Sequence, residues 1–286
     1  MSMIIDMHTH IFPDKMAVAV IDKLSRTSKS VAFSDGTLSG LIEGMHSGGV
    51  DSSVILPVAT NPHQVEKVND ASYNLNDKHF QEGILSFGCM HPDYENFLQE
   101  LSRLKSNGFK GIKIHPVYQD TDIDDVKYLR IFERAAELDL IVVTHSGLDI
   151  GFPGVVRCSP KMLRHVVEEI GNFKLVAAHM GGWKNWDEAA EYLSDTQIYI
   201  DTAFSTGTIT PRPDSTWRAE ELVMLNAEKF VEMVEAFGVD RILFGTDSPW
   251  SAQSDSIEFI KALPINEEDK AKILGGNAVR LLGISK

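Results

Sequence analysis

The chain has 286 residues, of which 43% are hydrophobic; this length is normal for one α/β barrel of about 250 residues. Its 27 basic and 41 acidic residues give a formal net charge of −14, which makes the chain a poor candidate for binding nucleic-acid phosphates or anionic membranes. The two cysteines, Cys89 and Cys158, form no Cys-x-x-Cys pair. They fit a reduced, cytoplasmic setting, and no apolar run is expected to be a signal peptide or a membrane span.

Eight short runs rich in apolar and β-branched residues recur along the chain at intervals of about 30 residues. Most are nearly continuous in apolar residues, as in strands that are buried on both faces. In chain order the predicted strands are 3–10, 52–58, 84–90, 109–115, 140–146, 174–180, 198–204 and 241–247.

Amphipathic segments lie between these runs and predict helices. Residues 93–108, 125–139 and 159–172 each place apolar side chains on one face, as expected for a helix that packs on a sheet. In the last of these, Ser159 is the expected N-cap and Pro160 the first helical residue.

Strands that alternate with helices in this way predict an α/β fold of the (β/α)₈ TIM-barrel type. The alternative is a doubly wound open sheet, which needs a Gly-rich first turn, and the chain offers no G-x-G-x-x-G. No low-complexity linker divides the chain, so residues 1–286 are predicted to form a single domain. Two long connections, 11–51 and 205–220, are expected to be lids.

The first predicted strand ends in two histidines, His8 and His10. Because side chains alternate along a strand, both point the same way. In a barrel they would point inward at the C-terminal end of the strand, where barrel active sites are built. Asp6 shares this orientation one layer deeper and is expected to orient a neighbour rather than to bind a metal.

Other strands end in similar residues. His145, His179 and Asp247 end the fifth, sixth and eighth predicted strands, and His115 ends the fourth, with Lys113 two residues deeper. Imidazole nitrogens together with a carboxylate suit Zn²⁺ or a similar divalent ion. The sequence therefore predicts one divalent metal ion at this rim, with zinc as the favoured ion and His8 and His10 as two arms of a clamp.

The arrangement of His8-x-His10, His145, His179 and Asp247 resembles the amidohydrolase superfamily. The segments "GFKGIKIHP", "THSG", "AAHMGG" and "RILFGTDSPW" are similar to its amidohydrolase-related branch, which contains metal-dependent hydrolases, including lactonases, and non-oxidative decarboxylases. The similarity runs from the first strand to "GGNAVRLLGI" at 275–284.

This resemblance implies four metal ligands: His8, His10, His145 and Asp247. Such a site keeps a net positive charge, which lowers the pKa of a bound water to roughly 7. It also implies that Asp247 shuttles a proton and that His179 acts as an acid, a base or an electrostatic stabiliser close to the metal.

In binuclear members of the superfamily a lysine on the fourth strand bridges two metals, so Lys113 and His115 keep a two-metal site open. We expect Lys113 to be a buried or ion-paired cation, and His115 either to bind substrate or to support the metal ligands from behind. Arg157 and Arg212 are candidates for a substrate carboxylate, and Trp250 for an apolar wall of the pocket.

Two catalytic functions fit these residues. The first is a hydrolase of a small ester, lactone or amide that uses a metal-activated water; the alternative is a non-oxidative decarboxylase of a carboxylated aromatic or conjugated substrate. A non-catalytic metal-stabilised barrel and a metal-dependent nuclease are weaker, because structural zinc sites favour cysteine ligands and a nuclease needs a basic groove. The expected partner is a small-molecule substrate, with no nucleic acid and no membrane; a homodimer stays open.

Overall fold

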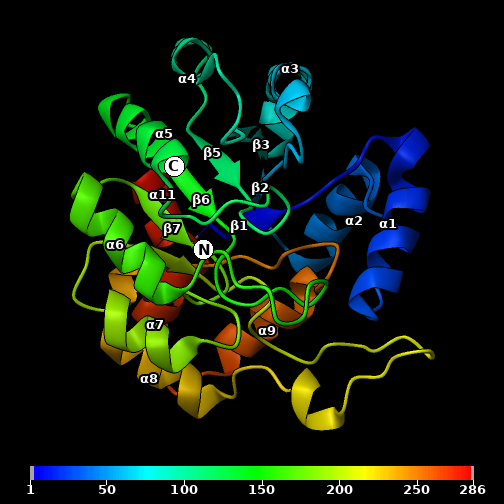
Figure 1. Ribbon diagram of the computed structural model, residues 1–286. Coiled ribbons are helices and arrows are strands. Elements are labelled where there is room, and N and C mark those ends of the chain that lie inside the picture. Colours follow the sequence, from blue (N-terminus) through cyan, green and yellow to red (C-terminus); the bar gives the residue numbers. More distant parts are fainter. Residues whose placement is uncertain (1–2, 285–286) are drawn as a thin grey trace. The chain divides into compact units, whose positions relative to one another are not determined.

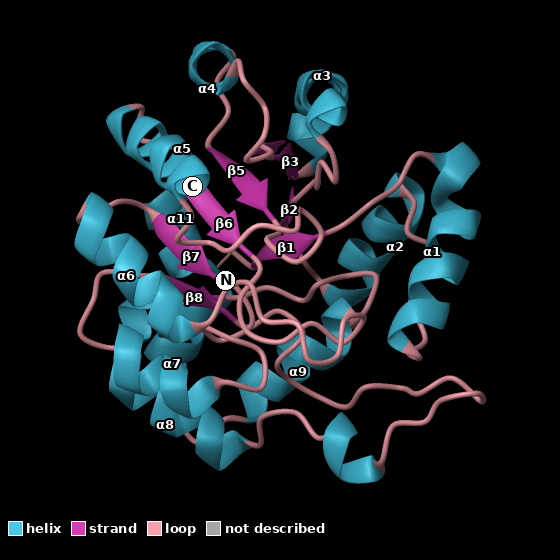
Figure 2. Ribbon diagram, in the orientation of Figure 1, coloured by secondary structure: helices cyan, strands magenta, loops and turns pink. Residues whose placement is uncertain are grey.

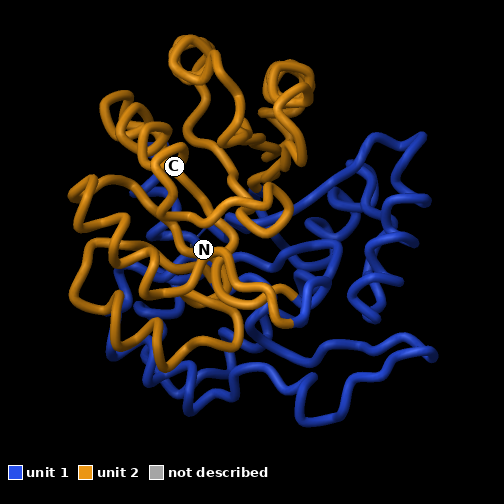
Figure 3. Tube along the Cα trace, viewed as in Figure 1, with its two compact units in different colours: residues 1–53, 150–153, 202–286 blue, residues 54–149, 154–201 orange. Residues whose placement is uncertain are grey.

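The structure, a computed structural model, describes residues 3–284. Two compact units make up the chain and are described separately (Figure 3). Unit 1 comprises residues 1–53, 150–153 and 202–286, and unit 2 comprises residues 54–149 and 154–201.

Unit 2 contains a parallel sheet whose strands follow one another in chain order, from β4 to β8 (Figure 2). The pairs β4–β5, β5–β6, β6–β7 and β7–β8 are all parallel. This order has no reversal, whereas a doubly wound sheet reverses at its switch point. The strands of unit 2 are β3 (Ile84–Ser86), β4 (Gly88–Cys89), β5 (Gly111–Ile114), β6 (Ile141–Thr144), β7 (Leu175–Ala177) and β8 (Tyr199–Asp201); β2 (Ser52–Ile55) starts in unit 1 and ends in unit 2.

The helices of unit 2 connect these strands, and α4 to α7 pack side by side along the sheet (Figure 1). The helix predicted at 159–172 begins as expected: the Ser159 hydroxyl accepts a hydrogen bond from the Met162 amide, and Pro160 is the first helical residue. The α-helices are α3 (Val65–His79), α4 (Phe97–Ser106), α5 (Val126–Glu137), α6 (Pro160–Ile170) and α7 (Trp186–Leu193), with 3₁₀ turns η1 (Pro62–Gln64) and η2 (Phe80–Glu82).

In unit 1 the first strand lies beside the segment that follows the last strand. The Met7 amide donates to the Phe244 carbonyl at 2.8 Å, and the Asp247 amide donates to the His8 carbonyl at 2.8 Å. The elements of unit 1 are β1 (Ile5–Thr9), α1 (Asp14–Ser28), α2 (Leu38–Gly48), η3 (Ala219–Leu222), α8 (Ala227–Phe237), η4 (Val239–Arg241), β9 (Ile242–Leu243), α9 (Gln253–Ala262), α10 (Glu267–Ala271), the π-helical η5 (Lys272–Gly276) and α11 (Asn277–Leu282).

Each of the eight predicted strand runs contains a strand, although the run 84–90 is split into β3 and β4 around Phe87. Most of the connection 11–51, which the sequence predicted as a lid, forms helices α1 and α2. Within residues 3–284, no helix is both long and apolar enough to cross a membrane.

Candidate metal centre

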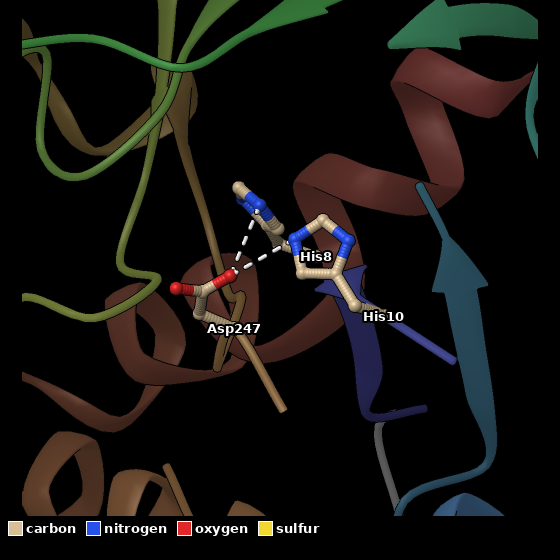
Figure 4. Close-up of side chains that lie close together, drawn as sticks. All are labelled: His8, His10 and Asp247. Carbon is tan, nitrogen blue, oxygen red and sulfur yellow. Dashed lines mark ion pairs between the residues drawn. The ribbon is translucent and has the colours of Figure 1, made fainter. Parts of the chain in front are cut away.

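Three predicted ligands meet in unit 1 at the end of β1 (Figure 4). The Nε2 atoms of His8 and His10 lie 3.4 Å and 3.0 Å from the same carboxylate oxygen, Oδ1 of Asp247. The two imidazole centroids are 5.1 Å apart and the rings are inclined at 74°. His8 is fully buried, so its polar ring needs a partner in the protein interior or a bound ion.

These separations fit a shared metal ion. Two ligand atoms of a tetrahedral zinc site lie about 3.3 Å apart, because each bond is about 2.0–2.1 Å long. One ligand atom from each of His8, His10 and Asp247 falls within 4.8 Å of the other two. Two neutral imidazoles and one carboxylate also form a donor set that divalent transition metals prefer.

The backbone of Asp247 is held in an unusual conformation. Its φ angle is 64°, in the left-handed region that aspartate tolerates better than most residues. The hydrogen bond from the Asp247 amide to the His8 carbonyl fixes this conformation. The turn brings a carboxylate back over β1, and such non-glycine φ values concentrate at functional sites.

A buried carboxylate, Asp6, organises the backbone beneath this group. Its Oδ1 accepts hydrogen bonds from the His8 and Thr246 amides at 3.1 and 3.0 Å. Its Oδ2 accepts from the Thr246 hydroxyl at 2.6 Å and from the Gln253 amide nitrogen at 2.7 Å. Burial raises the pKa of Asp6 to about 6, and the hydrogen bonds partly offset that rise.

Unit 2 holds a second group of ligand-type residues: His115, His145 and Asp149. The two imidazoles stack, with centroids 4.3 Å apart and planes inclined at 13°. Their Nε2 atoms lie 3.6 Å and 3.8 Å from Oδ2 of Asp149, and one ligand atom of each residue is within 4.8 Å of the others. All three residues are buried. Asp149 was not among the residues that the sequence singled out, because it lies in a loop with no periodic pattern.

His179 lies against this second group. Its Nε2 is 3.0 Å from Nδ1 of His145, so one of the two rings donates a hydrogen bond to the other. If neutral His145 is the donor, its Nε2 carries a lone pair that can bind a metal. If His179 is the donor, the His145 proton is on Nε2, the atom that faces Asp149. The His179 amide donates to the buried Asp201 carboxylate at 2.9 Å, which holds the residue at a φ of 61°.

A second residue that the sequence did not reveal, Gln119, ties the ends of several unit 2 strands together. Its Nε2 donates to the Ala59 and Met90 carbonyls at 2.8 and 2.6 Å. Its Oε1 accepts from the His115 amide at 3.1 Å and from the Tyr128 hydroxyl at 2.6 Å. All four hydrogen-bonding positions of the amide are therefore used, and the backbone of His115 is fixed.

Lys113 and the predicted substrate-binding residues differ in burial and in the partners that they contact. Lys113 is buried in β5, as expected. The Arg157 guanidinium pairs with Asp120 and with Asp122. Arg212 pairs with Asp214 at 2.9 Å. Trp250 directly follows the metal-site turn, and its amide donates to the Asp247 carbonyl at 2.8 Å.

The sequence matches the protein family described as "Amidohydrolase" over residues 5–284. The chain therefore belongs to the amidohydrolase family, as the sequence motifs indicated, and it is an enzyme. No curated protein sequence matches it significantly.

Solved structures of similar fold cover the chain almost completely. An uncharacterised TIM-barrel protein from Bordetella bronchiseptica has a TM-score of 0.75 at 16% identity, over 98% of both chains. A dihydroxybenzoic acid decarboxylase from a Polaromonas species, with bound manganese and the inhibitor 2-nitroresorcinol, has a TM-score of 0.69 at 15% identity, over 100% of this chain and 98% of its own. A probable 2-pyrone-4,6-dicarboxylic acid hydrolase from Acinetobacter baumannii has a TM-score of 0.63 at 14% identity, over 98% and 99%. These likenesses assign the chain to the TIM-barrel class, as predicted.

Proposed function

We propose that this enzyme is a metal-dependent, non-oxidative decarboxylase of a small carboxylated aromatic or conjugated acid. The observation that carries the proposal is the ligand group of His8, His10 and Asp247. It occurs in a chain that shares its fold over its full length with a manganese-containing dihydroxybenzoic acid decarboxylase. Decarboxylases of carboxyvanillate and of dihydroxybenzoate also recur among the structures of similar fold.

The metal we propose is a single divalent ion held by His8, His10 and Asp247, with His145 as the fourth ligand that the family resemblance implies. The nitrogen-rich ligand set favours zinc, whereas the Polaromonas decarboxylase structure contains manganese. When bound, such an ion supplies positive charge that attracts the oxygens of an acidic substrate and stabilises negative charge in the transition state.

His179 is the residue we propose as the proton donor. In decarboxylation a proton adds to the ring carbon that carries the carboxylate, the bond between that carbon and the carboxyl group breaks, and carbon dioxide leaves. The hydrogen bond between His179 and His145 orients the imidazole for such a transfer, and the Asp201 bond fixes the backbone that carries it. Asp247 is the alternative donor, because its carboxylate lies beside His8 and His10 at the proposed metal site.

Substrate contacts are proposed for His115, Trp250, Arg157 and Arg212. His115 offers a buried aromatic ring that already packs edge-on against Tyr118, with centroids 4.3 Å apart. The Trp250 amide donates a hydrogen bond to the Asp247 carbonyl, which holds Trp250 next to the metal-site turn. Each arginine already has aspartate partners, so binding a substrate carboxylate would require it to exchange them.

Hydrolysis is the second candidate. A probable pyrone dicarboxylic acid hydrolase shares the fold, and the same ligand group suits an enzyme that activates water. In that reaction Asp247 would accept the proton of the attacking water as the water oxygen bonds to the carbonyl carbon of a lactone or ester. The single bond between that carbon and the alkoxide oxygen would then break, and the proton would pass to the departing alkoxide.

One assay separates the two candidates. The protein is purified without a polyhistidine tag, loaded with zinc or manganese, and incubated with a panel of hydroxybenzoic acids and a panel of lactones that includes 2-pyrone-4,6-dicarboxylate. We expect carbon dioxide release from an aromatic acid, and loss of that release in Asp247→Asn. Lactone opening without carbon dioxide release would instead support the hydrolase, and metal-free protein with full activity would contradict both.

We further propose that the enzyme works in the cytoplasm on a freely diffusing small molecule. The support is that Cys89 and Cys158 are both buried free thiols, as a reducing compartment maintains them. The homodimer left open by the sequence can be tested by analytical ultracentrifugation.

A further inference from the structure

Asp6 offers only acceptor atoms, and four donors surround it. The side chain is fully buried, and each of its oxygens accepts two hydrogen bonds. A carboxylate has about four such acceptor positions, so nothing remains for a metal. Asp6 is also outside the groups of ligand atoms that approach one another within 4.8 Å among residues 3–284.

Its four donors come from the parts of the chain that carry the metal ligands. One is the backbone amide of His8 itself, and two belong to Thr246, the residue immediately before Asp247. The fourth is Gln253, the first residue of α9. A single carboxylate therefore joins the end of β1 to the turn that presents Asp247.

The polarity of this network requires a carboxylate. The Ser248 amide donates to the Thr246 hydroxyl oxygen at 3.1 Å, and the hydroxyl hydrogen is therefore directed at Asp6. The amides of His8 and Thr246 are donors only. An uncharged amide in place of Asp6 would turn its own N–H groups toward at least one of these donors, and the buried mismatch would loosen the turn.

We propose that Asp6 is a positioning residue that sets the separation between His8 and Asp247, and with it the affinity of this site for a divalent metal. The proposal shares one assumption with the proposed function, on which it rests: that His8, His10 and Asp247 form the metal site. Residues that orient metal ligands from behind typically change metal affinity by about 10–100-fold when they are replaced. An equivalent loss is expected here, because the spacing of 3.0–3.4 Å between ligand atoms would no longer be fixed before the metal binds.

Titration of the metal-free protein with zinc and with manganese, in competition with a chromophoric chelator, tests this. Asp6→Asn and Thr246→Val should each weaken binding of both metals by about 10–100-fold. The double variant should bind metal as tightly as the single variant with the lower affinity, because both changes break one network. Thr246→Ser keeps the hydroxyl and should restore affinity. The thermal midpoint of each metal-free variant is measured in parallel.

The matched control is Glu100→Gln in unit 2. Glu100 is also a buried carboxylate, and it accepts hydrogen bonds from Asn69 and Arg103. This change should lower the thermal midpoint and leave the metal dissociation constants unchanged. If Asp6→Asn does not fold, Thr246→Val decides the question alone.

The outcomes are distinct. Variants at Asp6 and Thr246 that lose thermal stability but bind both metals like the parent would show a merely structural role and overturn the inference, while the proposed function would stand. A parent protein that binds neither metal would overturn the metal site and this inference together.

Discussion

The two groups of ligand-type residues are built on different supports. In unit 1 the support is a carboxylate, Asp6, which accepts four hydrogen bonds. In unit 2 the support is an amide, Gln119, which donates two and accepts two. Each side chain matches the polar groups around it: N–H and O–H donors of the backbone and of side chains in unit 1, and two backbone carbonyls with two donors in unit 2.

The difference has an electrostatic consequence. A carboxylate behind His8 adds negative charge near two imidazoles and Asp247, which favours a cation there. Gln119 fixes the backbone of His115 without adding charge. The unit 1 group is therefore better suited to hold a metal, with His145 as its proposed fourth ligand. The remaining residues of unit 2 are better suited to contact a substrate ring through His115 and to transfer protons through His179.

The largest expected effect tests whether His145 serves the metal of unit 1 or only its neighbours in unit 2. If His145 is the fourth ligand, His145→Ala should lose metal as completely as His8→Ala. The loss of metal affinity should exceed the roughly 10–100-fold that is typical for residues behind a ligand. Asp149→Asn, in the same unit 2 group, should keep the metal content of the parent. Metal analysis of untagged protein measures both. Full metal content and activity in His145→Ala would remove that residue from the ligand set.

His179 should have the next largest effect, on turnover rather than on metal binding. His179→Asn keeps a side chain of similar polarity but cannot act as an acid or base, so turnover should fall by roughly 10²–10⁴-fold. Metal content should stay near that of the parent. Loss of the metal would instead identify His179 as a ligand and favour the two-metal alternative with Lys113 or His115.

The sequence predicted these two groups unequally. His8, His10 and Asp247 were found because strand ends carry a clear pattern: apolar runs place the strands, and alternation gives the side-chain direction. Asp149 and Gln119 were missed because they lie in loops, where no periodicity exists. The role of Asp149 depends on its approach to His115 and His145, and that of Gln119 on its hydrogen bonds to the Ala59 and Met90 carbonyls, far away in the chain.

The fold was predictable to a similar degree. All eight predicted strand runs contain strands, since buried strands of a parallel sheet are continuous in apolar residues. Helix α1 was missed within 11–51 because only Ala17, Ser25 and Ser28 are buried on it and its N-cap, Pro13, gives no side-chain hydrogen bond. Neither an apolar stripe nor a capping residue marked its start.

Gln119 should affect stability more than metal binding. Gln119→Leu has a similar volume but leaves the Ala59 and Met90 carbonyls, the His115 amide and the Tyr128 hydroxyl without their partner. Each buried unsatisfied group costs about 1–3 kcal/mol, and relaxation with entry of water should reduce the total loss to roughly 2–4 kcal/mol. Urea unfolding measures it, with the exposed Gln99→Leu as control.

The metal dissociation constant of Gln119→Leu should match that of the parent, which is the opposite of the expectation for Asp6→Asn. Equal losses of metal affinity in the two variants would show that the two supports act on one site and would end the distinction drawn between them.

The smallest effect concerns the two thiols, which report on unit 2 alone because Cys89 and Cys158 both lie in it. Burial raises the pKa of Cys89 far above its usual range and that of Cys158 to about 12. At pH 8 only about 1 in 10⁴ of such a thiol as Cys158 is ionised, and only the thiolate reacts. Ellman's reagent should therefore label neither cysteine in the folded protein and both in guanidinium chloride.

Removal of the metal by a chelator should leave both thiols protected, because they are buried within unit 2 while three of the four proposed ligands belong to unit 1. Rapid labelling of Cys158 after chelation would instead show that the metal holds the neighbourhood of His145 closed, since the Cys158 carbonyl accepts a hydrogen bond from the Gly147 amide two residues beyond that histidine.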